Sequence, residues 1–178
     1  LTDLFTHAVE LGMAAVATTG RGLGFGGCAG WYKARNAGIK PIVGVEAYLT
    51  PGTARGDKTR VKCGDGRRND VSGAGAYTHM TMWAENTAGM HNLFRLSSLA
   101  SIEGYYFKPR MDRELLQTYS KGLIATTGCP SGEVQTRLRL GQYDAARAAA
   151  AEFQDIFGKD NYFAEIMDHG LSIERRVM

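Results

Sequence analysis

The chain has 178 residues, of which 44% are hydrophobic and 22% are charged. This balance is typical of a folded globular protein and argues against disorder. No apolar run approaches the roughly 20 residues that a membrane-spanning helix needs, so we expect no membrane partner. Three scattered cysteines are too few for a disulfide framework. Because the first residue is Leu1 and no signal peptide is visible, we expect a fragment of a cytoplasmic protein.

The net charge of +3 is located in one segment of the chain. Residues 51–70 contain six Lys or Arg and three Asp, so the rest of the chain is balanced. A basic segment favours a phosphate-rich partner, and we take Arg67 and Arg68 as possible DNA contacts. A solvated surface loop is the alternative interpretation.

Apolar patterning predicts helices and strands in alternation. In the first part of the chain we expect a helix over 3–11 capped by Thr2 and Asp3, a strand over 14–18, a glycine-rich loop over 20–30, a helix over 31–36 and a strand over 41–49. After a long loop over 50–76, we expect a strand over 78–84, helices capped by Asn86 and Asp112, a strand over 123–127, a helix capped by Ser131, a helix over 142–157 and a strand over 162–167.

This alternation predicts an α/β fold with a mainly parallel sheet, either open or closed into a barrel. Folds of this kind carry their chemistry at the C-terminal ends of the strands. One pattern at such an end is Gly22-Leu23-Gly24-Phe25-Gly26-Gly27, which satisfies G-x-G-x-x-G. With Glu46 near the end of the next strand, it would bind a dinucleotide. In a stretch with six glycines among residues 20–30, a chance match is the alternative.

Four longer segments are more specific: GIKPIVGVEAYLTPG, YTHMTMWAENTAGMHNLFRLSS, TTGCPSGEVQTRLRLGQYDAA and NYFAEIMDHGLSIERR. Together they resemble the PHP (polymerase and histidinol phosphatase) domain of the bacterial DNA polymerase III alpha subunit family. The resemblance covers nearly the whole chain, in the same order. It implies that residues 1–178 are part of a distorted (βα)7 barrel.

The resemblance also implies a site for divalent metal. Glu46 in GVEAY, His79 in YTHM and Cys129 in TTGCPSGE match the family's carboxylate, histidine and cysteine ligands. Mixed oxygen, nitrogen and sulfur ligands suit zinc, manganese or iron. Taken alone, each residue has an ordinary interpretation: a solvated carboxylate, a hydrogen-bonded histidine and a small buried thiol.

The chain departs from the family at one ligand position. Family members carry Thr-Asp-His-Gly where this chain has Thr19-Gly20-Arg21-Gly22, so Arg21 replaces a histidine ligand. A guanidinium has no lone pair to donate to a metal. The family's first and last metal motifs also lie outside residues 1–178. The glycine-rich composition of residues 19–30 is what a short reading-frame slip in GC-rich coding DNA would give, so Gly20-Arg21 is either genuine or a sequence error.

The resemblance implies a parent chain that is a DNA-directed DNA polymerase, with Mg²⁺ in a palm domain outside this sequence. Its partners would be primer-template DNA, deoxynucleotides and other replicase subunits, including the sliding clamp. A PHP domain with intact ligands is associated with 3′–5′ exonuclease proofreading, and with three ligand positions we expect this chain alone to be inactive. The alternatives are a non-catalytic platform for the polymerase and a free-standing metal-dependent phosphoesterase.

Overall fold

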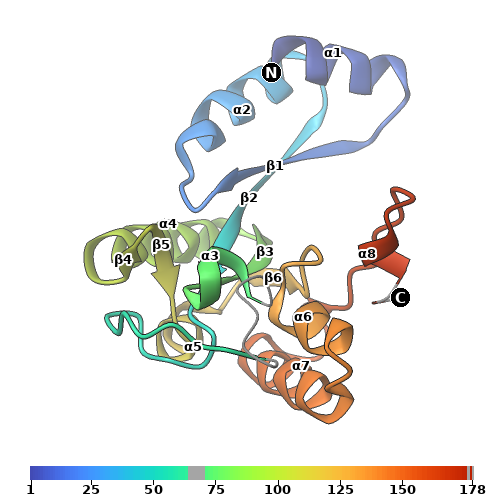
Figure 1. Ribbon diagram of the computed structural model, residues 1–178. Helices are drawn as coiled ribbons and strands as arrows, with labels where there is room; N and C mark the ends of the chain where they lie inside the picture. Colours follow the sequence, from blue (N-terminus) through green and yellow to red (C-terminus); the bar gives the residue numbers. More distant parts are fainter. Residues whose placement is uncertain (64–70, 176, 178) are drawn as a thin grey trace.

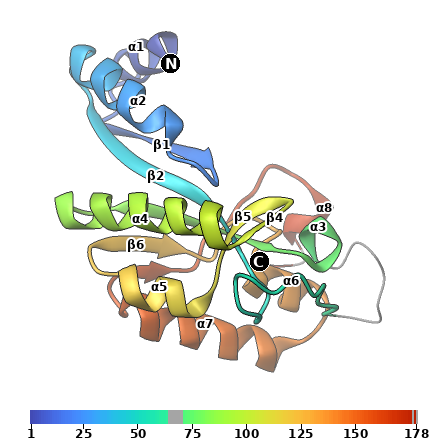
Figure 2. The same cartoon turned by 90° about the vertical axis from the view of Figure 1, so that its left-hand side faces the viewer.

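One long strand, β2 (Lys40–Leu49), joins two parts of the molecule in the computed structural model, which describes residues 1–63, 71–175 and 177 (Figure 1). The smaller part, here called the N-terminal lobe, contains α1 (Thr2–Glu10), β1 (Ala15–Arg21) and α2 (Phe25–Asn36). Figure 2 shows this lobe extending from the body along β2.

The body contains the remaining elements. They are α3 (Ser72–Gly75), β3 (Thr78–Ala84), α4 (Thr87–Glu103), β4 (Tyr105–Tyr106), β5 (Lys108–Met111), α5 (Arg113–Tyr119), β6 (Leu123–Thr126), α6 (Glu133–Arg139), α7 (Tyr143–Phe157), β7 (Tyr162–Phe163) and α8 (Ser172–Arg175). No helix within the described residues is both long and apolar enough to cross a membrane.

The strands form one seven-stranded mixed sheet in the order β4-β5-β2-β3-β6-β7, with β1 also paired to β2. The pairs β1–β2, β2–β5 and β6–β7 are parallel. The pairs β2–β3, β3–β6 and β4–β5 are antiparallel. The predicted α/β class is therefore confirmed. The mainly parallel sheet is found only in part, because β3 runs against both of its neighbours.

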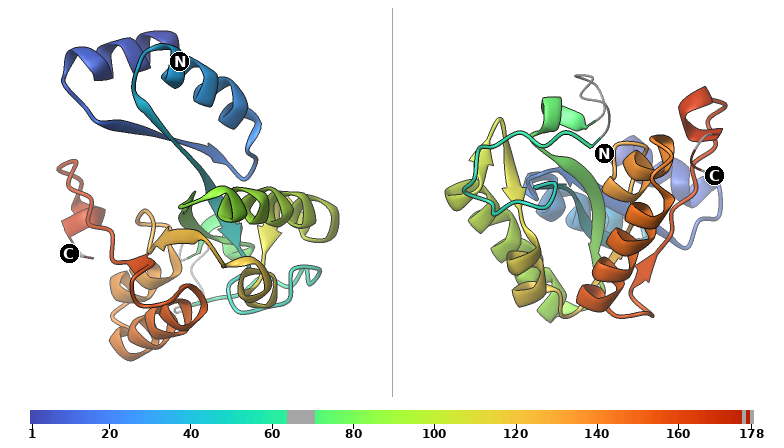
Figure 3. Two further views of the ribbon diagram at one scale, coloured as in Figure 1. Left: turned by 180° about the vertical axis from the view of Figure 1, so that it is seen from behind. Right: turned by 60° about the horizontal axis from the view of Figure 1, so that its bottom comes forward.

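One face of the sheet is apolar and is covered by α4, α5 and α7 (Figure 3). Side chains alternate between the faces of a strand, so Val45, Ala47 and Leu49 of β2 enter this core together. Met80 and Met82 of β3 join them from the neighbouring strand. The N-terminal lobe has a separate small core of Phe5, Ala8, Ala34 and Ile39. The opposite face of β2 and β3 is left free for polar side chains.

Two predicted helix caps are confirmed. The Asn86 side chain accepts a hydrogen bond from the Gly89 backbone N–H at the start of α4. The Asp112 carboxylate accepts one from the Leu115 N–H at the start of α5. In both cases a side-chain oxygen satisfies an N–H that the first helical turn leaves without a partner.

Other expectations from the sequence are corrected. The caps expected at Thr2 and Ser131 are wrong, since α1 and α6 begin after Leu1 and Gly132 without a side-chain cap. Residues 20–30 are not one loop, because β1 reaches Arg21 and α2 begins at Phe25. The α2 glycines allow a close approach to the sheet: a Cβ on Gly30 would lie 3.1 Å from the Thr18 side chain.

Three further strands differ from the prediction. The strand expected over 162–167 contains only Tyr162–Phe163, which pair with the last two residues of β6. The β4–β5 hairpin was not predicted. The hairpin has two strand residues before Phe107 and four after it, too few for a recognisable alternation of apolar and polar residues. Arg67 and Arg68 lie outside the described residues.

The crossing of α4 over the turn before β6 gives a test of this packing. A Cβ on Gly89 would lie 1.7 Å from the Gly122 carbonyl oxygen, whereas one on Gly26 of α2 meets no atom within 4 Å. Gly89→Ala should therefore destabilise the protein by about 3 kcal/mol through overpacking. Gly26→Ala should instead stabilise it by about 0.5 kcal/mol through helix propensity. Urea unfolding measures both, and equal stability of the two variants would contradict the crossing.

Candidate metal centre

The direction of β3 brings the predicted ligands to one edge of the sheet. Because β3 is antiparallel to β2, its first residues lie beside the C-terminal end of β2, where Tyr48 pairs with His79. The strand β6 is antiparallel to β3 in turn, so it ends at the same edge, three residues before Cys129. This explains why His79 can belong to a strand-end site although it begins its own strand.

Glu46 and His79 project from the same face of the sheet. Glu46 pairs with Thr81, and His79 is two residues from Thr81 on β3, so period-2 alternation places both side chains opposite the apolar core. Their side chains retain 22% and 17% exposure, respectively. The site is therefore partly shielded but open to an incoming ion.

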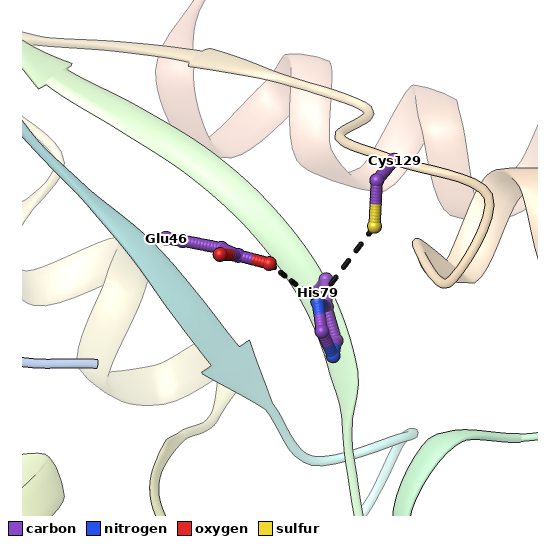
Figure 4. A group of neighbouring side chains, drawn as sticks. All are labelled: Glu46, His79 and Cys129. Atoms are coloured by element: carbon purple, nitrogen blue, oxygen red, sulfur yellow. Dashed lines mark hydrogen bonds and ion pairs between the residues drawn. The ribbon is translucent and has the colours of Figure 1, made fainter. Parts of the chain in front are cut away.

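The three predicted ligand residues meet (Figure 4). The His79 Nδ1 lies 2.7 Å from the Glu46 Oε1 and 3.7 Å from the Cys129 Sγ. One ligand atom from each residue lies within 4.8 Å of the others. Among residues 1–63, 71–175 and 177, this is the one group of at least three His, Cys, Asp or Glu side chains so arranged.

Backbone contacts hold the Cys129 turn against β3. The His79 N–H donates to the Ser131 carbonyl oxygen over 3.1 Å. Gly128 has φ +78°, and a Cβ there would lie 3.3 Å from the His79 carbonyl oxygen. From α6, the buried Gln135 side chain donates to the Gly128 carbonyl oxygen over 3.1 Å. Sequence reasoning did not identify Gln135, because its partner lies seven residues away across a turn.

His79 and Cys129 shift one another's protonation. Burial alone lowers the pKa of His79, but its interactions with Cys129, and then with Glu46, outweigh burial and raise that pKa above the ordinary value. Burial raises the pKa of Cys129, but hydrogen bonds from His79 and the Ser131 backbone bring it below the ordinary value. The pair therefore favours a thiolate, the form of cysteine that binds metals.

Aromatic rings surround the histidine on its other sides. The Tyr48 ring contacts His79 edge to face with 5.2 Å between centroids, and the Tyr77 ring centroid lies 5.8 Å from the same imidazole. Sequence reasoning did not identify Tyr48. The signal available was its position two residues after Glu46, which places both on one face of β2.

Arg21, which the resemblance aligns with a ligand position, lies beside Glu46. It pairs with Glu46 across β1 and β2, and its Nε lies 3.3 Å from the Glu46 Oε2. The Arg21 side chain is 80% exposed. An exposed ion pair contributes at most about 1 kcal/mol, far below the roughly 10 kcal/mol of structural zinc binding. Arg21 therefore does not block the site, but it supplies no ligand.

The donor set fits one divalent ion. In a tetrahedral zinc site, with bonds of about 2.0–2.3 Å, ligand atoms lie roughly 3.3–3.8 Å apart. The 3.7 Å between Sγ and Nδ1 agrees with this, and the 2.7 Å between Oε1 and Nδ1 is a hydrogen bond that an ion would replace. Three protein ligands leave a fourth position open.

The dinucleotide interpretation does not agree with this geometry. The β1–α2–β2 unit does have parallel strands, as that fingerprint requires. However, the Glu46 carboxylate that would hold a ribose contacts His79 and Arg21 instead.

The histidine of the MDHG segment, His169, contacts Glu174 and not the candidate ligands. Its Nδ1 lies 2.7 Å from the Glu174 Oε1, which is a hydrogen bond.

Comparison with known proteins identifies the family to which the chain belongs. The profile of the PHP domain family matches residues 1–169, and the chain belongs to this family. It is 57% identical over 183 residues to the DNA polymerase III subunit alpha of Saccharopolyspora erythraea, covering 98% of this chain and 15% of the relative. The protein of the same name from Mycobacterium tuberculosis is 55% identical over 180 residues, again covering 15% of the relative. The protein of that name from Thermus aquaticus is 40% identical over 163 residues, covering 92% of this chain and 12% of the relative.

The coupling between His79 and Cys129 predicts thiol reactivity in metal-free protein. Replacing His79 by Phe keeps a ring between Tyr48 and Tyr77 but removes the hydrogen bond that lowers the Cys129 pKa. In a Cys28→Ser background with chelator present, alkylation by iodoacetamide at neutral pH should slow roughly tenfold, and the midpoint of the rate against pH should rise.

The matched control is His169→Phe, which should leave the alkylation rate unchanged because His169 contacts Glu174 and not Cys129. Mass spectrometry assigns the alkylated cysteine. Equal rates for the His79→Phe variant and the parent would contradict the coupling.

Proposed function

We propose that this chain is the metal-holding part of a PHP module in a bacterial replicative DNA polymerase, the DNA polymerase III alpha subunit. The observation that carries the proposal is the convergence of Glu46, His79 and Cys129, with ligand atoms within 4.8 Å of one another. The family match and the relatives named above support the polymerase context.

In this proposal Glu46, His79 and Cys129 bind one divalent ion. Zinc suits the mixture of imidazole nitrogen, thiolate sulfur and carboxylate oxygen best, with manganese or iron as the alternatives. A bound ion of this kind supplies Lewis acidity and lowers the pKa of a water in its open position. The chain's own residues orient the ligands: Tyr48 and Tyr77 fix the imidazole, and the turn at Gly128 fixes the thiol.

We infer that the module supports the polymerase and that this chain alone does not hydrolyse DNA. Hydrolysis of a phosphodiester by paired metals uses two ions about 4 Å apart. The described residues gather a single group of ligands, and Arg21 occupies the position of a further one. The module would then be a platform within a distorted (βα)7 barrel. The longer polymerase would bind primer-template DNA, deoxynucleotides and Mg²⁺, together with the sliding clamp and other subunits.

Proofreading by 3′–5′ exonuclease activity is the second candidate, favoured by the open fourth position of a three-ligand site. The identity of residue 21 separates the two candidates. Resequencing codons 19–30 tests it directly: Asp-His at positions 20 and 21 would favour the nuclease, and Gly20-Arg21 the platform.

Zinc titration against a chromophoric chelator tests the metal site. The chain should bind one zinc ion, and Cys129→Ser should weaken binding at least tenfold. Arg21→His should tighten it roughly tenfold, because it removes a cation beside Glu46 and adds an imidazole donor. Arg21→Ala separates the two effects by removing the cation alone. His7→Ala is the control, and wild-type affinity in Cys129→Ser would contradict the site.

A nuclease assay tests the platform role. With a labelled primer carrying a mispaired 3′ end, the wild-type chain should release no nucleotide in the presence of zinc or manganese. Arg21→His should be assayed beside it, since it restores one ligand. Metal-dependent release by the wild-type chain that is lost in Cys129→Ser would contradict the platform and support proofreading.

A further inference from the structure

A second surface, formed by other segments than those that carry the candidate ligands, combines exposed aromatic rings with positive charge. It consists of the β4–β5 hairpin and the chain that passes beside it after β2 (Figure 3). We call it the hairpin surface, and its residues are Lys58, Arg60, Lys62, Tyr105, Tyr106, Phe107 and Lys108.

A buried arginine joins the two parts of this surface. Arg110 is 1% exposed, and its guanidinium donates only to backbone carbonyls. Its Nη2 lies 2.9 Å from the Arg55 oxygen and 2.8 Å from the Asp57 oxygen, while its Nε reaches the Gly104 oxygen over 3.1 Å. The segment before Lys58 is thereby fixed to the base of the hairpin, so the surface is preorganised.

The hairpin displays its rings to solvent. Tyr105 is 63% exposed and Phe107 is 58% exposed. The Tyr106 and Phe107 ring centroids lie 4.5 Å apart. Phe107 forms the turn with φ +60°, a left-handed conformation that is unfavourable for a bulky side chain. Strained residues of this kind concentrate at binding sites, where the strained conformation serves recognition.

Cations lie beside the rings. The Arg60 guanidinium lies 5.4 Å from the Phe107 ring centroid, and its Nε lies 3.4 Å from the Tyr106 hydroxyl. Within the described part of the chain, no carboxylate lies within ion-pair distance of Lys58, Arg60, Lys62 or Lys108. The nearby Glu103 carboxylate is paired with Arg55 instead. The four cations outnumber the exposed Asp57 carboxylate of the same segment, so the surface carries net positive charge.

The hairpin surface also reaches the metal centre. The Lys108 Nζ lies 5.6 Å from the centroid of the Tyr48 ring. Tyr48 in turn contacts the His79 imidazole edge to face, with 5.2 Å between centroids. A chain of cations and rings thus runs from the Phe107 turn to the candidate ligands.

We propose that the hairpin surface binds single-stranded nucleic acid. Phosphates would lie along Lys58, Arg60, Lys62 and Lys108, and unpaired bases would stack on Phe107 and Tyr105. A duplex hides the faces of its bases, and an acidic peptide offers none, so neither uses the exposed rings. The inference goes beyond the metal site, and it does not require that a metal be bound.

Fluorescence anisotropy with a labelled oligothymidylate of about 16 nucleotides tests the proposal. The key variant is Phe107→Gly, which removes the ring and also relieves the left-handed backbone. Its thermal unfolding midpoint should be unchanged or higher, while its affinity for the oligonucleotide should fall roughly tenfold. If Phe107 had only a structural role, Phe107→Gly would not keep or raise the unfolding midpoint while weakening oligonucleotide binding.

Lys108→Ala should lower the slope of log affinity against log salt by about 0.7, the contribution of one phosphate contact on a single strand. The matched controls lie on α2: Tyr32, which is 59% exposed, and Lys33, which is also exposed. Tyr32→Ala should leave the affinity unchanged, and Lys33→Ala should leave the salt slope unchanged.

Three results would overturn the proposal: wild-type affinity in Phe107→Gly, equal affinity for a duplex of the same length, or equally effective competition by polyglutamate. All measurements are made with chelator and repeated in Cys129→Ser, which should bind like the wild type. Failure of the metal proposal therefore leaves this test interpretable.

Discussion

Pairing of β2 with β3 in opposite directions, from Gly44–Trp83 to Leu49–Thr78, is the constraint on which the candidate centre depends. It brings the start of β3 to the end of β2, and the further reversal at β6 brings Cys129 to the same edge. Backbone geometry then separates the chemistry from the core, because alternate residues of one strand point to opposite faces. Val45 and Ala47 pack under the helices, while Glu46 between them faces His79.

Four ionisable side chains meet at the candidate centre: Glu46, His79, Cys129 and Arg21. The contact between His79 and Cys129 raises the pKa of the imidazole and lowers the pKa of the thiol, and a bound metal would take the place of this contact. Arg21 contacts the other carboxylate oxygen of Glu46, but the Arg21 side chain is mostly exposed, so this ion pair is weak.

Local features of the sequence predicted local structure well. The Asn86 and Asp112 caps are confirmed because each needs only a side chain and an N–H three residues away. The hairpin around Phe107 and the buried Arg110 were missed. Arg110 looks like a surface cation in sequence, and its acceptors at Arg55, Asp57 and Ala76 are 34 to 55 residues distant. Periodicity carries no information about such partners.

The sequence by itself determined the α/β class, most helices and the identity of three residues that match a ligand set. Hydrophobic period and capping chemistry act over a few residues, so they are readable along the chain. Only the tertiary structure decided that Glu46, His79 and Cys129 meet, that Arg21 contacts Glu46, and that Lys108 continues the hairpin surface towards Tyr48. Strand direction and register set those contacts, and both depend on how distant segments bury their apolar faces together.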